Sequence, residues 1–371
     1  MRGYADHEIA FMNRALALAR RGQGRVEPNP MVGCVLADGG RTIAEGHHRR
    51  FGGPHAEVVA LRRAGPRALG STAYVTLEPC SHFGKTPPCC DALIEAGVRR
   101  VVVAMKDPFP EVSGRGIRRL RKAGITVDVG LCRAEAEEFN APYLTLLRRG
   151  RPHVILKWAQ SLDGKIATRT GDSQWISGQA SRRLVHRLRA RVDAVMVGIN
   201  TVLRDDPLLT ARDVPVRRTA TRVVADSRLR LPPTSRLVAT AAAVPLLVMT
   251  TRAAASTPRA DRLRAAGATV RPCRTRGGRL DLAHLLTHLG RLRMTNLLVE
   301  GGGHLLADLL DRNLADEAYV FVAPKLIGGG DAVQAYPGRG ARTIAETPTL
   351  RCITHRRIGP DLLAHIRFDP P

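Results

Sequence analysis

The sequence predicts a protein of two α/β domains. Its 371 residues exceed what one hydrophobic core ordinarily serves, since a domain usually spans roughly 100–200 residues. Apolar segments of strand length alternate with segments of helical periodicity along most of the chain, as in a sheet covered by helices. A basic turn at 148–152 interrupts this alternation. We therefore expect one domain over residues 1–148 and a second over 152–371.

The first domain is predicted to open with a helix over 7–21, where apolar residues recur every three or four positions and Gly22 follows as a stop signal. Asp38-Gly39-Gly40 is a turn between a strand over 31–37 and a second strand near Ile43. The other predicted elements are a helix from His55 to about Gly65, strands over 73–77, 100–104 and 126–130, and helices over 89–96, 117–122 and 135–147.

The second domain repeats the alternation, without an internal repeat in its sequence. The residues 214–218, basic and containing a proline, are predicted to form a surface loop. The predicted strands lie at 153–159, 194–198, 221–225, 245–250, 269–273, 296–300 and 317–323, and the helices at 178–191, 259–266, 282–289 and 304–310.

The charge of the chain makes nucleic acid a partner to consider. There are 58 basic and 33 acidic residues, giving a formal net charge of +25. The arginines are spread along the whole length, however, and aromatic residues make up only 4% of the chain, which is little material for stacking bases. The composition favours small phosphorylated ligands, and no nucleic acid is expected.

Neither export nor membrane insertion is expected. The first eleven residues carry Asp6 and Glu8 and lack the layout of a signal peptide, and no apolar run approaches the ~18 residues of a membrane span. Seven scattered cysteines suit reduced thiols and metal binding better than a disulfide framework. We expect a cytoplasmic protein.

Three short motifs predict a zinc site: His55-Ala56-Glu57, Pro79-Cys80 and Pro88-Cys89. One imidazole and two thiolates make three protein ligands, and catalytic zinc sites use three where structural sites use four. Zinc lowers the pKa of a bound water to about 7, and a nearby glutamate can then shuttle protons, as in zinc-dependent base deaminases. The motifs thus predict removal of an amino group from a ring.

The spacing of His55 and Glu57 sets a condition on the local structure. Residues two apart on a regular helix point about 200° away from each other. The two side chains therefore converge only if His55 lies at the mouth of its helix, and Pro54 in front of it fits that placement.

Longer runs around these motifs resemble known enzymes. The first domain resembles the cytidine-deaminase-like superfamily and, more closely, the bifunctional riboflavin-biosynthesis deaminase/reductases, which also have eight residues between the two cysteines. The runs in the first domain are Pro28-Asn29-Pro30-Met31-Val32-Gly33, Pro54-His55-Ala56-Glu57-Val58 and Thr76-Leu77-Glu78-Pro79-Cys80-Ser81-His82-Phe83-Gly84-Lys85-Thr86-Pro87-Pro88-Cys89. Those in the second domain are Leu156-Lys157-Trp158-Ala159-Gln160-Ser161-Leu162-Asp163-Gly164-Lys165, Ser173-Gln174-Trp175-Ile176, Asp205-Asp206-Pro207 and Val299-Glu300-Gly301-Gly302.

The resemblance, which extends from about residue 10 to about 330, implies fold and activity. It implies a cytidine-deaminase-like three-layer first domain and a dihydrofolate-reductase-like α/β second domain. The implied reactions are hydrolytic deamination of a diaminopyrimidinone ribosylamino 5′-phosphate and NADPH-dependent reduction of its ribosyl chain to ribityl. Zn²⁺ and NADPH are the implied cofactors, and a homo-oligomer is the implied assembly.

The resemblance also assigns residues. Glu57 is the implied proton shuttle, and His55, Cys80 and Cys89 the zinc ligands. The implied pyrimidine and phosphate contacts are Asn29, His48, His82 and Lys85. In the second domain the implied substrate contacts are Lys157, Ser173, Arg189, Leu209, Arg212 and Glu300. The implied dinucleotide contacts are Ala159, Trp175, Thr201, Asp205, Ser227, Gly302 and Gly303.

Two other interpretations remain open at this point. A tRNA or DNA deaminase would share the zinc chemistry and suit the positive charge, but it would leave the second domain without a role. A zinc-stabilised binding module without activity would need a fourth ligand, for which only Cys90 or His82 is available nearby. Titration with NADPH and with single-stranded RNA over a range of salt concentrations separates these interpretations.

Overall fold

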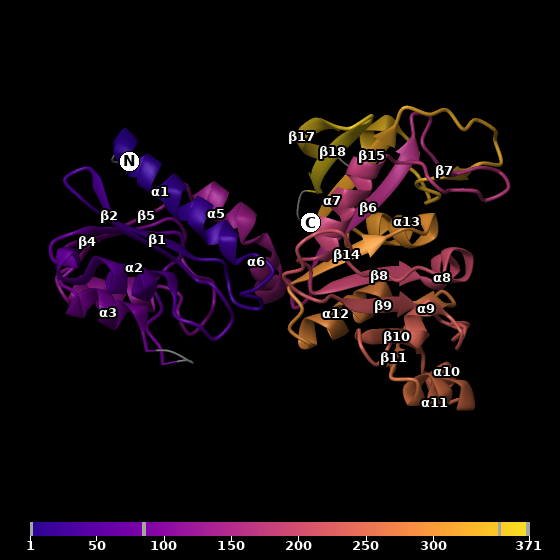
Figure 1. Ribbon diagram of the computed structural model, residues 1–371, viewed down its shortest axis with the longest axis horizontal. Coiled ribbons are helices and arrows are strands. Elements are labelled where there is room, and N and C mark those ends of the chain that lie inside the picture. The colour runs from indigo at the N-terminus through magenta and orange to yellow at the C-terminus, as the bar shows by residue number, and fades with distance from the viewer. Residues whose placement is uncertain (1–2, 84–86, 348–349, 369–371) are drawn as a thin grey trace. The chain divides into compact units, whose positions relative to one another are not determined.

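The computed structural model describes residues 3–83, 87–347 and 350–368. The chain divides into two compact units, Met1–Gly150 and Arg151–Pro371 (Figure 1). Each unit has its own sheet and its own hydrophobic cores.

The first unit is built on a five-stranded sheet in the order β2-β1-β3-β4-β5. Strand β1 pairs antiparallel with β2 and β3, whereas β3, β4 and β5 run parallel. The strands are β1 (Gly33–Asp38), β2 (Arg41–His47), β3 (Thr72–Val75), β4 (Arg100–Val103) and β5 (Thr126–Val129).

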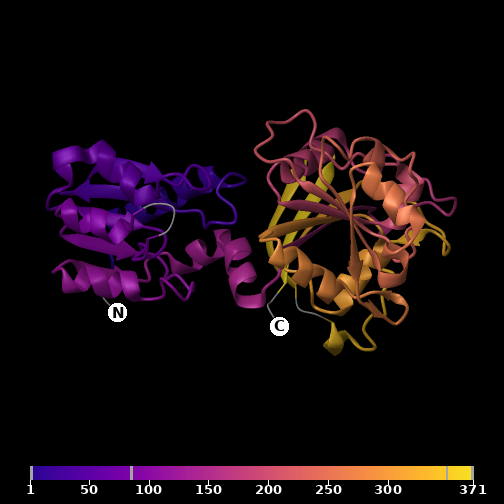
Figure 2. The same ribbon diagram turned by 90° about the horizontal axis from the view of Figure 1, so that it is seen from below.

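Helices cover both faces of this sheet, which makes the predicted three-layer arrangement (Figures 1 and 2). One core joins the sheet to α1 (Asp6–Ala19), α5 (Arg133–Phe139) and α6 (Ala141–Arg149). The other joins it to α2 (Ala56–Ala64), α3 (Cys89–Glu95) and α4 (Arg115–Lys122). The turns η1 (Arg20–Gly22) and η2 (Gly65–Ala68) follow α1 and α2.

The single helix predicted over 135–147 is wrong, because the chain forms α5 and α6 with a break at Asn140. The buried Asn140 side chain accepts a hydrogen bond from Met31 N–H (2.9 Å) and donates one to Met31 O (3.1 Å). Pro142 then occupies the first turn of α6, where its missing N–H costs nothing. The break thus ties α5 and α6 to the segment that precedes β1.

The second unit is built on a nine-stranded sheet in the order β11-β10-β9-β8-β14-β6-β15-β18-β17. The strands from β11 to β15 in this order are parallel, and β18 and β17 are antiparallel to their neighbours. The strands are β6 (His153–Ser161), β8 (Ala194–Gly198), β9 (Thr221–Ala225), β10 (Leu246–Thr251), β11 (Thr269–Cys273), β14 (Asn296–Glu300), β15 (Glu317–Ala323), β17 (Leu350–Ile358) and β18 (Asp361–Phe368).

Two hydrophobic cores lie on opposite faces of this sheet. One contains apolar side chains of α7 (Gln179–Arg189), α8 (Ile199–Asp205), α9 (Arg236–Ala239), α10 (Arg252–Ala255) and α11 (Pro258–Ala265). The other contains those of α12 (Leu282–Arg291) and α13 (Gly303–Asp311). The small pairs β7 (Lys165–Ala167) with β16 (Val333–Gln334) and β12 (Thr275–Arg276) with β13 (Arg279–Leu280), and the turn η3 (Ile344–Glu346), lie outside the main sheet.

The predicted alternation of strands and helices is confirmed for the main sheet of the second unit, but the prediction missed several elements, among them the short helices α9 and α10 and the small strands β7, β12, β13 and β16. The prediction stopped at residue 323 and missed the hairpin β17–β18, whose last strand pairs with β15 from Glu317↔Arg367 to Val322↔Leu362. It also missed α8, which is only seven residues long and shows too few turns for a periodic pattern. No helix in the described ranges is long and apolar enough to cross a membrane.

Candidate active sites

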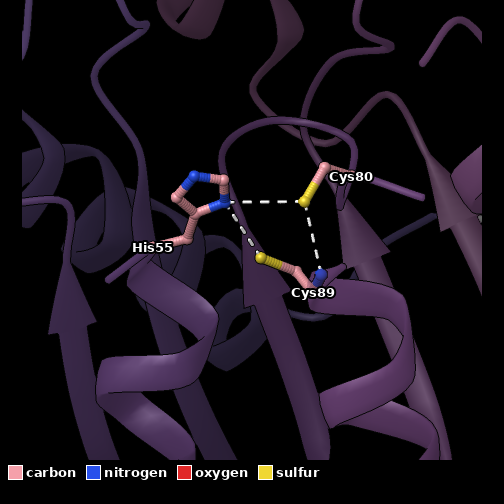
Figure 3. A group of neighbouring side chains, drawn as sticks. All are labelled: His55, Cys80 and Cys89. Atoms are coloured by element: carbon pink, nitrogen blue, oxygen red, sulfur yellow. Dashed lines mark hydrogen bonds between the residues drawn. The ribbon is translucent and has the colours of Figure 1, made fainter. Parts of the chain in front are cut away.

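The three predicted zinc ligands of the first unit meet at one end of its parallel strands (Figure 3). His55 is the N-cap of α2 with extended backbone (φ −72°, ψ 164°), so it does lie at the mouth of the helix as predicted. Cys89 is the first residue of α3, and Cys80 lies in the loop that leaves β3. His55 Nδ1 is 3.1 Å from Cys89 Sγ and 3.5 Å from Cys80 Sγ.

This group fits a zinc ion. Zn–N and Zn–S bonds of about 2.0–2.3 Å in a tetrahedron place a nitrogen and a sulfur about 3.5 Å apart, close to both observed separations. Within the described residues the group has three members, and Cys90 is not one of them because its thiol points to the carbonyl oxygens of Pro79 and Gly116. Three protein ligands are typical of catalytic rather than structural zinc.

The loop that carries Cys80 is anchored by Glu78, a residue to which the sequence analysis gave no role. The buried Glu78 carboxylate accepts hydrogen bonds from Gly114 N–H (2.9 Å), Asp107 N–H (3.3 Å) and Ile117 N–H (3.2 Å). It therefore joins the end of β3 to the start of α4. The one feature of the sequence that indicates a role for Glu78 is its position two residues before a predicted metal ligand.

Glu57 lies in the first turn of α2 and is only 3% exposed. Burial raises the pKa of Glu57 to about 7, against the opposing effect of His55. Hydrogen bonding from Cys89, aided by His55, lowers the pKa of Cys80, so that one thiolate forms readily beside the imidazole. A carboxyl group with a pKa near neutrality can both accept and return a proton at physiological pH.

Asn29 and His48 adjoin the metal ligands. The His48 ring lies edge-on to the His55 ring, with centroids 5.3 Å apart. His48 Nδ1 is 3.0 Å from the Pro54 carbonyl oxygen, which can only accept, so Nδ1 carries the proton. Nε2 is then the acceptor for the Asn29 amide at 3.4 Å, and burial lowers the pKa of His48, which favours this neutral form.

The remaining predicted contacts of this site are His82 and Lys85. His82 lies 6.1 Å from Phe109, ring to ring, and its Nδ1 is buried without a hydrogen-bond partner in the described part of the chain. An unpartnered ring nitrogen is available to a ligand. Lys85 lies outside the described residues.

In the second unit, predicted substrate contacts gather at the carboxyl end of β14 and beside it in the middle of β6. Glu300 and Lys157 are directly paired positions of these two parallel strands. Arg189 of α7 holds Glu300 with two hydrogen bonds, Nε to Oε1 (2.5 Å) and a terminal nitrogen to Oε2 (2.8 Å). Burial opposes ionisation of Glu300, but the charge of Arg189 and its hydrogen bonds outweigh burial, so the pKa of Glu300 is lowered. Burial also lowers the pKa of Lys157, because it disfavours the charged ammonium group.

The glycine run that follows β14 fits a dinucleotide. Gly301 and Gly302 have positive φ (70° and 75°), and Gly303 begins the nine-residue α13. A Cβ on either of the first two would face Thr201 Oγ1 at 3.5 Å, and one on Gly303 would lie 2.8 Å from Pro337 Cδ. Bare backbone N–H groups before a helix suit a pyrophosphate, and side chains would fill this cradle.

The other predicted ligand contacts of the second unit are spread over several elements. Leu209 is buried in the core, so its side chain is not available to a ligand, and Arg212 N–H donates to His186 Nδ1 at 3.2 Å. The Trp175 ring is 61% exposed and stacks on the Arg182 guanidinium, with 4.6 Å between Cζ and the ring centroid. Ala159 lies within β6 and Asp205 is the last residue of α8, whereas Ser173 and Ser227 lie in the loops that follow β7 and β9.

Two family models match the chain. Residues 5–105 match the cytidine and deoxycytidylate deaminase zinc-binding region. Residues 152–364 match the RibD C-terminal domain.

Similar proteins and structures extend over nearly the whole chain. The riboflavin biosynthesis protein RibD of Aquifex aeolicus (strain VF5) is 42% identical over 95% of this chain and 96% of its own length, and that of Escherichia coli (strain K12) is 43% identical over 96% and 98%. The structure of Acinetobacter baumannii RibD, form 1, superposes with a TM-score of 0.87 at 36% identity, covering 98% of this chain and 99% of that one. A diaminohydroxyphosphoribosylaminopyrimidine deaminase/5-amino-6-(5-phosphoribosylamino)uracil reductase from Thermotoga maritima superposes with a TM-score of 0.84 at 35% identity, with the same coverage.

A three-ligand metal group in one unit and a glycine cradle in the other define a bifunctional enzyme, a zinc deaminase joined to a reductase. Its cofactors are Zn²⁺ and NADPH. The chain belongs to the RibD family of riboflavin biosynthesis proteins.

Proposed function

We propose that residues 1–148 hydrolyse the 2-amino group of 2,5-diamino-6-ribosylamino-4(3H)-pyrimidinone 5′-phosphate, and that residues 152–371 then reduce the ribosyl chain to give 5-amino-6-ribitylamino-uracil 5′-phosphate. The observation that carries this proposal is the buried Glu57 beside the three-ligand group, in one chain with the glycine cradle. The printed activity of the Thermotoga maritima relative supports the choice of substrate.

In the deaminase unit, His55, Cys80 and Cys89 would hold the metal. Bound Zn²⁺ supplies an activated water as the nucleophile at neutral pH. Glu57 takes one proton as this water adds to the ring carbon and passes it to the ring nitrogen. It then takes the second proton from the new hydroxyl group and gives it to the amino group as the carbon–nitrogen bond breaks, so that one water enters and one ammonia leaves. The pKa of about 7 suits Glu57 to both transfers.

Asn29, His48, His82 and Lys85 would position the substrate. The neutral His48 and the amide of Asn29 form one hydrogen-bonded pair beside His55, which can present a fixed pattern of donors and acceptors to a flat heterocycle. Lys85 would supply positive charge for the phosphate.

In the reductase unit, Lys157 and Glu300 would lie beside the sugar, with Ser173, Arg189, Arg212 and the backbone of Leu209 as further contacts. Bound NADPH supplies a hydride. Reduction of the open-chain ribosyl form at C1′ also consumes one proton, and Lys157, whose pKa burial lowers, can hold and release it. The dinucleotide would contact Ala159, Trp175, Thr201, Asp205, Ser227, Gly302 and Gly303.

The proposal is tested by identifying the products formed from the proposed substrate with and without NADPH. The expected products are the deaminated ribosyl compound and ammonia without NADPH, and the ribityl compound with it. Ammonia release without reduction in the presence of NADPH would contradict the second activity alone, and loss of both would contradict the proposal.

We propose three further properties that rest on weaker support. Two of the metal ligands are thiolates, which require reduced cysteines, and this favours a location in the cytoplasm. Family membership favours a homo-oligomer, which light scattering on the purified chain tests. The low aromatic content of 4% disfavours nucleic acid as a partner, and RNA titration at several salt concentrations tests this.

A further inference from the structure

The segment between α8 and β9 carries two of the proposed substrate contacts, and its backbone is strained. Three of its residues have a positive φ although none of them is glycine: Asp206 (36°), Leu209 (55°) and Asp213 (57°). Residues with a side chain seldom adopt this left-handed conformation, which persists only where the surrounding structure holds it. The conformation of residues 206–213 therefore depends on contacts with other elements.

The beginning of this segment is held by the core and by α9. The Leu209 side chain is buried in one of the two hydrophobic cores. Asp206 Oδ1 accepts a hydrogen bond from Arg236 N–H (2.9 Å) at the start of α9. Arg212 and Asp213, at the end of the segment, are exposed, so the core does not hold them.

The end of the segment is held by two side chains of α7. A terminal nitrogen of Arg189 donates a hydrogen bond to Thr210 O (3.2 Å). His186 Nδ1 accepts a hydrogen bond from Arg212 N–H (3.2 Å). His186 and Arg189 are three residues apart in the helix and therefore lie on the same face of it. Because a backbone N–H can only donate, His186 must present an unprotonated Nδ1 to Arg212.

The surroundings of His186 favour its neutral form. The charged groups that face it are Arg189 of the same helix, Arg212 of the segment and Glu300 of β14. Burial lowers the pKa of His186, and the two arginines lower it further, against the opposing effects of Glu300 and of the Thr210 backbone. The bond from Arg212 N–H is therefore intact at neutral pH and is lost as the pH falls through this lowered pKa.

The two arginines of this region differ in what they can offer a ligand. The Arg189 guanidinium is occupied by the Glu300 carboxylate and by Thr210 O. The Arg212 side chain is exposed, and its guanidinium makes no hydrogen bond or ion pair with another described residue. It can therefore bind the 5′-phosphate of the proposed substrate through paired, charge-assisted hydrogen bonds.

We propose that His186 is a positioning residue that fixes the backbone of Arg212 and thereby aims the Arg212 guanidinium at the 5′-phosphate of the substrate. This inference rests on the proposed reductase function and adds to its substrate site a residue that does not itself touch the substrate. A fixed backbone lowers the entropy that is lost when the guanidinium binds phosphate.

The test is steady-state reduction of the deaminated ribosyl compound by full-chain variants, with KM and kcat determined separately. His186→Ala removes the acceptor for Arg212 N–H, so KM should rise roughly tenfold. Because Lys157 and the dinucleotide contacts are untouched, kcat should stay within about twofold of the wild type. For the same compound without its 5′-phosphate, kcat/KM should differ by less than about twofold between the wild type and His186→Ala.

His186→Asn separates positioning from charge. The amide oxygen of asparagine can take the place of Nδ1 as the acceptor, and an amide does not titrate. At neutral pH the KM of this variant should therefore lie within about threefold of the wild-type value. As the pH falls from about 7.5 to about 5, the ratio of the wild-type KM to that of His186→Asn should rise, because only the wild type loses the bond. Ionisation of the substrate phosphate affects both proteins alike.

The matched control is Arg187→Ala, which replaces an exposed arginine next to His186 in α7 and should keep the wild-type KM and pH profile. All variants should bind NADPH with wild-type affinity in titration, which shows that the second unit is folded. The inference would be overturned, with the reductase function intact, by an unchanged KM in His186→Ala or by an equal loss for the compound without phosphate. It would also be overturned if His186→Asn were as poor as His186→Ala. Failure of the wild-type chain to reduce the phosphorylated compound would overturn the reductase function itself.

Discussion

Replacing Glu78 with glutamine tests whether the Cys80 loop is held by the carboxylate behind it. Three backbone N–H groups, from Asp107, Gly114 and Ile117, donate to the two carboxylate oxygens. Glutamine has nearly the same shape but only one acceptor oxygen. In its better orientation the oxygen keeps the bonds from Gly114 and Asp107, and the amide group then faces Ile117 N–H, donor against donor.

The expected loss of stability follows from the number of hydrogen bonds that the substitution removes or weakens. One buried N–H left without a partner costs about 1–3 kcal/mol, and the two remaining bonds lose their charge assistance. The free energy of unfolding of the first unit should therefore fall by about 2–4 kcal/mol. For a unit of this size that corresponds to a decrease in Tm of about 5–15 °C. Because Glu78 fixes the backbone next to Cys80, zinc affinity should also weaken, roughly tenfold to a hundredfold.

Unfolding of the full chain is followed by differential scanning calorimetry and by tryptophan fluorescence, which together distinguish the first unit from the second. Both tryptophans, Trp158 and Trp175, belong to the second unit, so the fluorescence transition reports that unit alone. It should not move in Glu78→Gln, whereas the calorimetric transition of the first unit should. Competition with a chromogenic chelator measures the zinc affinity.

The matched control is Glu45→Gln. Glu45 pairs with Arg14 on the surface of the same unit, with side chains 27% and 44% exposed, and such pairs contribute about 0–1 kcal/mol. If Glu78→Gln is no less stable than Glu45→Gln and holds zinc as tightly, the carboxylate does not anchor the loop and the reasoning is refuted.

Three other predictions follow from the two units. Glu57→Gln should lower ammonia release about 10²–10⁴-fold with normal zinc content, and retained turnover would exclude Glu57 as the proton shuttle. Removal of zinc by a chelator should abolish ammonia release but leave NADPH binding unchanged in titration, and a parallel loss of NADPH binding would show that the units do not act separately. The third concerns Glu317, which is bonded to His153 (3.1 Å) and to His365. Burial opposes its ionisation, but the two histidines outweigh burial and lower the pKa of Glu317. Its contribution to stability is therefore present above the unfolded-state pKa of about 4.3 and is lost as the pH falls toward the lower folded-state value. Fluorescence-detected unfolding between pH 6 and pH 2 should show this acid destabilisation in the wild type and less of it in Glu317→Gln, and equal slopes in the two proteins would contradict the assignment.

The zinc group shows how far a sequence can predict a site. Residue type and spacing identified His55, Cys80 and Cys89, and the angular argument correctly placed His55 at the start of α2. The position of Glu78 two residues before Cys80 marks it as a candidate, but its partners were not predictable, because they come from residues 107–117 and their convergence depends on the fold. Similarly, the pairing of Arg189 with Glu300 joins α7 to β14 across 111 residues of sequence.

Errors in the predicted elements have local causes. The break between α5 and α6 was missed although Pro142 marks it, because the apolar pattern continues through it. The final hairpin was missed because residues 354–357 of β17 are polar and mostly basic, and such a strand at the edge of a sheet lacks a continuous apolar face. Its place beside β15 depends on long-range pairing.

The residues assigned to deamination all lie before residue 150, and those assigned to reduction all lie after 151. A polypeptide defective in one step therefore retains everything assigned to the other. Neither the Glu57→Gln protein nor the Lys157→Ala protein should complete both reactions alone. A mixture of the two should form the final product, because the intermediate can pass from one protein to the other through solvent. Genes carrying these two lesions should complement each other in one cell.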